Sequence, residues 1–179
     1  MSETTNTLVF DEYLLDSPIG KLIIWLDKQN ILQFIGWDEF KEETLQQLAR
    51  YYQVKEIVLQ PSSQSNTVIQ TIENYFKGDI KGIDSLAVAN FGTDFQKQVW
   101  QALRTIPAGG TISYGELAEQ IGKPLASRAV GMANHCNPIA IVVPCHRVIG
   151  KNNKLTGYAG GVERKQWLLD HECYHITLA

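Results

Sequence analysis

The stretch SYGELAEQIGKPLASRAVGMANH, residues 113–135, decides the fold of the second half of this chain. Ser113 and Glu116 have the spacing of a capping box, so a short helix is expected over residues 114–121. The Gly-Lys-Pro that follows breaks this helix, and another is expected over about 125–134. Two short helices around a three-residue turn that contains glycine are the pattern of a helix-turn-helix.

The second predicted helix carries one cation among small residues. Arg128 projects from among Ala126, Ala129, Gly131 and Ala133. A helix of this kind could lie close to a DNA groove with the long cation reaching inward. The same small residues would also permit close packing in a core. These residues alone leave both interpretations open.

The remaining pattern predicts an α+β fold. Apolar runs predict strands at residues 8–14, 21–26, 31–37 and 54–59, and helical spacing predicts helices at 38–52 and 66–76. A linker with Gly78, Gly82 and Gly92 follows, and a capping box of Thr93 and Gln96 starts another helix. We expect a small N-terminal antiparallel-sheet-plus-helix domain over residues 1–90, and a mostly helical domain over 91–179.

Composition restricts the class of protein. The chain has 179 residues, 44% of them apolar, which is enough for a substantial core. Three cysteines and a polar N-terminus without the pattern of a secretory leader predict a protein of the reducing cytoplasm or the nucleus, and of these we expect the cytoplasm. No apolar run approaches the roughly 20 residues that a membrane span needs.

Charge is distributed unevenly along the chain. Residues 1–90 have a net charge of −6, whereas residues 91–179 have a net charge of +3. Between residues 123 and 165 there are seven Lys and Arg and a single acid, Glu163. A polyanion binds to a local basic face and does not respond to the net charge of the whole chain. A plain solvated surface would also account for this charge distribution.

The chemistry is concentrated in IAIVVPCHRVI, residues 139–149. An apolar run ends at Pro144, which places Cys145 at the edge of a core. His146 and Arg147 beside it could favour the reactive thiolate. A small buried hydrophobe is the alternative, and these residues alone do not decide between nucleophile and filler.

Other titratable residues carry weaker signals. Glu172 follows a predicted helix end, where a carboxylate opposes the helix dipole, so a hydrogen bond to a histidine is expected to hold it there. His171 and His175 are expected to be exposed. The His and Cys residues lack the spacing of a zinc site, so no metal is expected.

The second half of the chain closely resembles the methylated-DNA–protein-cysteine methyltransferases, also called O6-alkylguanine-DNA alkyltransferases. The resemblance covers nearly all of residues 91–173, and its most specific motif is PCHRV at 144–148, with Arg128 and Tyr158 in the expected order. The first half matches the family only loosely. The resemblance implies direct DNA repair, in which an alkyl group moves from O6 of guanine, or less certainly from O4 of thymine, to Cys145.

The resemblance also implies roles for individual residues. His146 would act as a base through a water, Glu172 would orient it, and Tyr114 would donate a hydrogen bond to the leaving guanine. Arg147 is expected to form a structural ion pair. The thioether is a dead end, so each molecule would act once, without a cofactor.

The target base would have to leave the duplex to reach a buried thiol. The resemblance implies that the helix-turn-helix binds the minor groove of double-stranded DNA, that Arg128 fills the vacated stack, and that Ala126 and Ser127 lie close to the DNA. The implied anchor of the active-site strand is Asn137, the loop over the base contains Tyr158 and Ala159, and main-chain groups near Cys145 and Val148 read the guanine edge. The expected state is a monomer.

Two departures and two alternatives accompany this interpretation. Some members have serine where this chain has Ala159, which removes a hydroxyl contact to O6, and some bind zinc in an N-terminal domain that here has no Cys or His. A non-catalytic DNA-damage-recognition protein is the main alternative, but such proteins lack the reactive cysteine. A Cys-His hydrolase would need an oxyanion hole, for which the sequence contains no signal.

Overall fold

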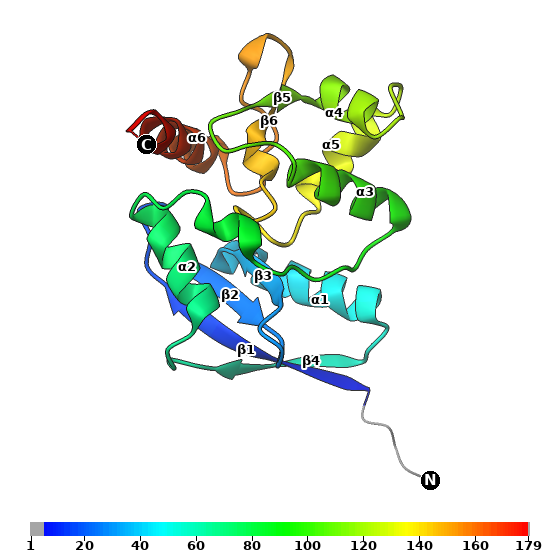
Figure 1. Cartoon of the computed structure of the whole chain (residues 1–179). Helices are drawn as coiled ribbons and strands as arrows, with labels where there is room; N and C mark the ends of the chain where they lie inside the picture. The colour runs from blue at the N-terminus through cyan, green and yellow to red at the C-terminus, as the bar shows by residue number, and fades with distance from the viewer. Residues whose placement is uncertain (1–5, 179) are drawn as a thin grey trace.

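A four-stranded sheet with two helices precedes a mostly helical region in the computed structural model, which describes residues 6–178 (Figure 1). The elements of the first half are β1 (Thr7–Leu15), β2 (Leu22–Leu26), β3 (Leu32–Gly36), α1 (Lys41–Tyr52), β4 (Glu56–Pro61) and α2 (Thr67–Phe76). The α+β class is therefore confirmed. The first five residues, which contribute to the expectation about a leader, lie outside the described range.

The sheet is mixed, so the expectation of a purely antiparallel sheet is wrong. Its order is β3-β2-β1-β4, and β4 pairs with β1 in parallel, while the other two pairs are antiparallel. The reason is α1, which carries the chain back along the sheet between β3 and β4. A strand that follows such a crossover runs parallel to the one before it, and β3 already runs parallel to β1.

The second half contains α3 (Asp94–Leu103), α4 (Tyr114–Gln120), α5 (Ser127–His135) and α6 (Val162–Leu178), with a short parallel pair of β5 (Ile112–Ser113) and β6 (Val148–Ile149). Both predicted capping boxes are present, at Thr93 and at Ser113. The helix-turn-helix is confirmed, but its connection spans residues 121–126 and not three residues. Pro124 disfavours helix in the residue before it, and Gly122 has a φ of +76°, so the chain needs a longer path.

The predicted linker packs against the sheet and is not a loose connection. Ile83 and Phe91 in it are buried, and a 3-10 turn forms over Gly82–Ser85. Leu32 of β3 donates to the carbonyl of Ala87 and accepts from the amide of Ala89. One continuous core includes residues from both halves, and the proposed division between residues 90 and 91 stays a prediction.

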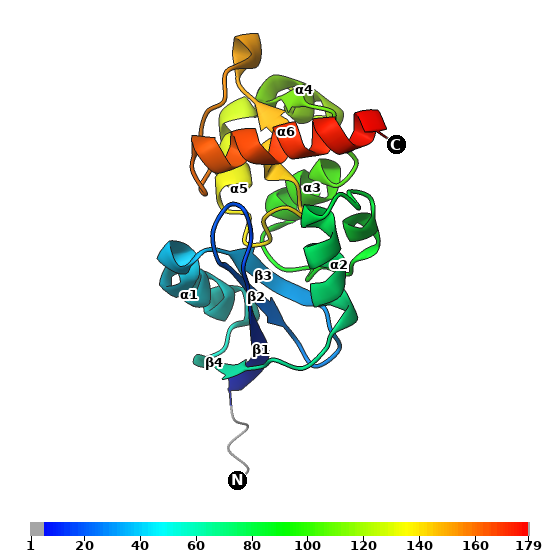
Figure 2. The same ribbon diagram turned by 90° about the vertical axis from the view of Figure 1, so that its left-hand side faces the viewer.

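Figure 2, turned by 90° from Figure 1, shows α6 running across the second half, above α2. The views agree that α2 and α6 meet, although they are far apart in sequence. Within residues 6–178 the structure contains no helix of the length and apolarity needed to cross a membrane.

Candidate active site

The apolar run before Cys145 forms a buried turn, so the expectation of an active-site strand there is wrong. Only Ile139 makes a sheet-like bridge, with Ile35 of β3. Ile141 has a φ of +74°, a strained conformation for a β-branched residue, which prevents continuous pairing. Asn137 holds the turn: its amide nitrogen donates to the carbonyl of Val143 at 2.8 Å, and its oxygen accepts from the amide of Ile139 at 3.0 Å.

Cys145 begins a 3-10 turn, Cys145–Arg147, directly after Pro144. Its side chain is buried, with 6% of the residue exposed. Burial raises the pKa of this thiol, against the smaller opposing effects of Asn137 and Lys165. The resting group is therefore a protonated thiol, which needs a base before it becomes a good nucleophile.

His146 and Arg147 turn away from the cavity and meet Glu172 of α6. His146 Nε2 donates to Glu172 Oε1 at 2.7 Å, as expected for the partner of this carboxylate. Arg147 donates to both carboxylate oxygens, from Nε at 3.0 Å and from Nη2 at 2.9 Å, which confirms its structural ion pair. His146 Nδ1 is buried and has no hydrogen-bond partner among the described residues.

Burial and hydrogen bonds act in opposite directions on this network. Burial alone would raise the pKa of Glu172, but the contacts of His146 and Arg147 hold it well below its ordinary value of 4.5. Burial lowers the pKa of His146 below 6.5, against the attraction of Glu172. The site therefore rests with an ionised carboxylate and a neutral imidazole.

Two of the expectations about α6 are wrong. Glu172 does not follow a helix end, because α6 continues to Leu178, so the helix dipole does not account for its position. The two histidines are not exposed: His171 is buried and its Nε2 donates to the carbonyl of Tyr75 at 2.7 Å, while His175 is half-buried. A longer α6 places the side chains of His171 and Glu172 against the core.

Two functional candidates were not found from the sequence. Tyr75 of α2 donates its hydroxyl to Glu172 Oε1 at 2.8 Å, from a half of the chain that was expected to be only structural. Lys165 is fully buried, and its ammonium donates to the carbonyls of Val148 at 2.6 Å and Thr156 at 3.1 Å. A signal for Lys165 existed, because its spacing to Glu172 places both on one face of α6.

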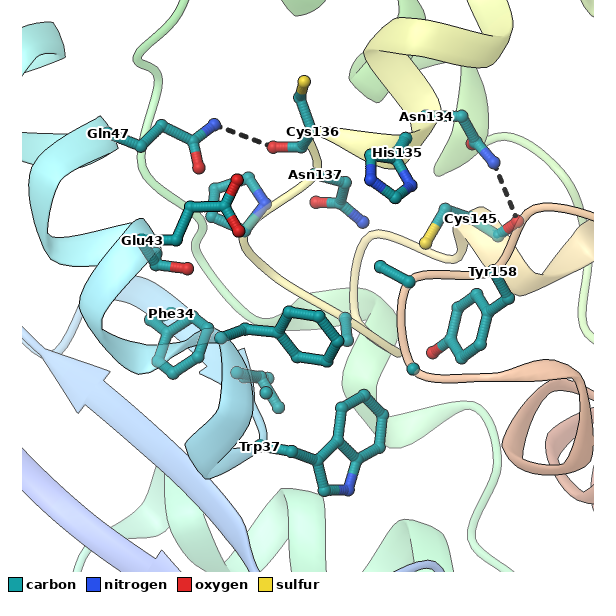
Figure 3. Close-up of a pocket in the computed structure, with 18 of the residues that line it drawn as sticks. Phe34, Trp37, Glu43, Gln47, Asn134, His135, Cys136, Asn137, Cys145 and Tyr158 are labelled. Atoms are coloured by element: carbon teal, nitrogen blue, oxygen red, sulfur yellow. Dashed lines mark hydrogen bonds between the residues drawn. The ribbon is translucent and has the colours of Figure 1, made fainter.

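A cavity of about 290 Å³ opens beside the thiol. Figure 3 shows the sulfur of Cys145 directed into it, with Asn137, Tyr158 and Trp37 around it. Ala159 also lines this cavity. The structure thus brings four of the sequence-predicted site residues to one cavity: Asn137, Cys145, Tyr158 and Ala159.

The loop that carries Tyr158 lies close to β3. A Cβ on Gly160 would come within 2.7 Å of Trp37, so only glycine fits at this point of the loop. Tyr114, at the start of α4, donates its hydroxyl to the carbonyl of Thr156 at 3.3 Å. The carbonyl of Val148 already accepts from Lys165, and that of Cys145 accepts from Asn134 at 3.3 Å.

A second, open groove lies on the helix-turn-helix. Tyr114, Ser127, Arg128 and Lys151 line it, and its volume is about 320 Å³. Arg128 is exposed on α5, while Ala126 precedes the helix and is half-buried. In this region Leu125 is fully exposed and Met132 is 65% exposed, which is unusual for large apolar residues without a partner.

The described residues, 6–178, contain no group of three His, Cys, Asp or Glu side chains that could hold a metal ion. The fold and the site together define a class: a helix-turn-helix protein with a buried cysteine–histidine–glutamate site.

Comparisons with known proteins agree with this class. The family model for the 6-O-methylguanine DNA methyltransferase DNA-binding domain matches residues 94–174. A methylated-DNA–protein-cysteine methyltransferase of Shigella flexneri is 47% identical over 163 residues, which cover 91% of this chain and 95% of the relative. One of Methanosarcina acetivorans is 44% identical over 159 residues, which cover 89% and 96%.

Among solved structures, the chain is similar to Mycobacterium tuberculosis OGT in complex with DNA, with a TM-score of 0.75 and 40% identity over 94% of each chain. The chain belongs to the methylated-DNA–protein-cysteine methyltransferase family. The resemblance drawn from the sequence is thereby confirmed.

Proposed function

We propose that this chain repairs DNA directly, by transferring the alkyl group of O6-alkylguanine to the sulfur of Cys145. The observation that carries the proposal is one buried thiol that lines a cavity and directly precedes, in the chain, a histidine bonded to a buried glutamate. Family membership supports the reaction, since the relatives are named for methyl transfer from DNA to a protein cysteine.

The reaction is a displacement at the alkyl carbon. The thiolate of Cys145 forms a bond to that carbon, the bond from carbon to O6 breaks, and its electron pair stays on the guanine. The thiol proton passes through a water to His146 Nδ1, the ring nitrogen that does not donate to Glu172. Glu172 holds the ring in this tautomer and stabilises the imidazolium that forms.

Tyr114 supports departure of the guanine. Burial raises the pKa of its hydroxyl, so it remains a proton donor as negative charge develops on the base. Ala159 lacks the hydroxyl contact to O6 that a serine makes in other members, so only its backbone N–H remains for this contact. The product is a thioether, so each chain acts once.

Access to the thiol requires a flipped base. We propose that α5 binds the minor groove of double-stranded DNA, that Arg128 occupies the vacated stack, and that Ala126 and Ser127 allow close approach. Support comes from the exposed Arg128 and Lys151 on one groove and from the relative solved in complex with DNA. Asn137, Tyr158 and Val148 would shape the pocket for the base.

The test is incubation of the full chain with a duplex that contains O6-methylguanine, followed by mass spectrometry of intact protein and peptides. The expected result is one methyl group per chain, located on Cys145, with the DNA returned to guanine. A folded protein with a reduced Cys145 that binds the lesion but gains no methyl group would overturn the proposal in favour of a non-catalytic damage-recognition protein.

The finer properties belong to the same proposal. A parallel duplex with O4-methylthymine tests the second lesion, and light scattering tests the monomer. The cytoplasmic location follows from the reduced cysteine that the reaction needs, and fractionation of cells tests it.

A further inference from the structure

Glu172 receives one hydrogen bond from outside the second half of the chain. Its Oε1 atom accepts from three donors, His146 Nε2, Arg147 Nη2 and the hydroxyl of Tyr75, the last at 2.8 Å. Tyr75 and Glu172 are both fully buried. Since a buried polar contact of this kind is costly to leave unmade, its presence calls for a reason.

Tyr75 takes part in two hydrogen bonds that join the end of α2 to α6. Besides the hydroxyl contact, the main-chain carbonyl of Tyr75 accepts from His171 Nε2 at 2.7 Å. The rings of Tyr75 and His171 also meet edge to face, with centroids 5.3 Å apart. Figures 1 and 2 show α2 reaching α6 at this end. The hydroxyl is therefore held in place and does not depend on a flexible side chain.

We propose that Tyr75 is a positioning residue for alkyl transfer, which acts through Glu172 to keep His146 oriented and neutral. This inference rests on the proposed function. Tyr75 touches neither the thiol cavity nor the base, so it is not a catalytic residue. Tyr75 and Arg147 both donate hydrogen bonds to the Glu172 carboxylate and stabilise its negative charge. This charge then attracts a proton to His146 less strongly.

Few charged and titratable groups surround Glu172 and His146. His146 is close to Glu172 and Lys165 of α6 and to Arg147 of its own turn, and Glu172 also interacts with Tyr158 and His171. Burial above all raises the pKa of Tyr75 well beyond 10, so its hydroxyl stays a donor. Removing this donor leaves the carboxylate charge shared by fewer groups and strengthens its pull on the His146 proton.

The experiment compares Tyr75→Phe with wild type in single-turnover methyl transfer from O6-methylguanine DNA across pH. We expect a rate lower by about tenfold on the plateau, because Glu172 without this donor holds the His146 ring less firmly in the orientation that accepts the thiol proton. We also expect the acidic limb of the profile to move to higher pH, because His146 protonates more easily. Lesion binding should stay unchanged.

Tyr51→Phe is the control for the contact between the halves; because Tyr51 also lines the thiol cavity, its stability and pH profile are compared, and not its rate. The Tyr51 hydroxyl also joins the two halves, by donating to Gln96 Oε1 at 3.1 Å, but it does not contact Glu172. If Tyr75 served only to hold the halves together, both variants would lose stability and neither would shift the pH profile, which would overturn the proposal.

A second variant keeps the test decisive if Tyr75→Phe folds poorly. Replacement of Tyr75 with 3-fluorotyrosine retains the ring and makes the hydroxyl a stronger donor, so the acidic limb should move to lower pH. An unchanged profile in this protein would overturn the role of Tyr75. Failure of wild type to accept any methyl group would instead overturn the proposed function, which keeps the two failures separate.

Discussion

The helix-turn-helix and the Glu172 network are two regions with opposite physical characters. Residues 113–135 are local in sequence, and α5 presents Arg128 and Met132 to solvent. The network joins α2, the Cys145–Arg147 turn and α6, and its polar groups are almost entirely buried. Changes in the first region are expected to alter DNA affinity, whereas changes in the second alter chemistry and stability.

The largest expected effect comes from Cys145→Ala. Methyl transfer should be abolished while lesion binding is retained, because alanine keeps the main chain that Asn134 contacts and removes only the thiol. Mass spectrometry measures the first effect and fluorescence anisotropy the second. Cys173→Ala, at an exposed position, is the control and should transfer normally. Loss of lesion binding in Cys145→Ala would mean that the thiol is structural.

Glu172→Gln should destabilise the protein by about 3–5 kcal/mol, because it leaves the buried guanidinium of Arg147 without its counter-charge. Methyl transfer by the fraction that remains folded should fall as well. Denaturant unfolding gives the free energy, and Glu163→Gln, exposed on the same helix, is the control.

The pH dependence of this variant provides an internal check. The pKa of Glu172 lies below its ordinary 4.5 in the folded state, so its contribution is present above about pH 4.5 and is lost as the pH falls. Glutamine does not titrate, so the stability of Glu172→Gln should fall less steeply in acid than that of wild type. Equal slopes would show that this carboxylate does not govern acid unfolding.

The two regions also differ in how far the sequence predicts them. Both capping boxes specify their helices through contacts three residues apart, which a linear pattern contains. The sequence allowed the inference that a histidine is the partner of Glu172, but not that Glu172 lies in the middle of α6. Tyr75 lies on a regular apolar stripe of α2, so its burial is predictable, while a contact across 97 residues depends on how α2 meets α6.

The errors have two origins. The direction of β4 follows from the order strand, helix, strand, which the sequence pattern contains. The buried turn before Cys145 depends on tertiary packing, since Ile141 adopts a conformation that its residue type disfavours. Local propensity cannot indicate such a residue, because the surrounding core holds it in place.

Arg128→Ala should weaken binding to lesion DNA by roughly ten- to hundredfold. Reaction with the free base O6-methylguanine should be unchanged, since the network and thiol are untouched. Lys55→Ala, an exposed cation on the sheet side, is the control. The salt dependence decides the role: a slope reduced by about one would indicate a phosphate contact, and an unchanged slope would indicate insertion into the stack.

The smallest expected effects come from substitutions at the N-caps of α3 and α4, which have the same type of cap. Ser113→Ala and Thr93→Ala each remove a side-chain acceptor for a helix N-terminus, and each should cost about 1 kcal/mol of unfolding free energy. Only Ser113 precedes Tyr114, which lines the groove with Arg128, so only Ser113→Ala should also weaken DNA binding by a few fold. If both variants bound DNA as wild type does while losing equal stability, the cap of α4 would not contribute to the DNA interface, and the proposed contact of this helix end with DNA would be wrong.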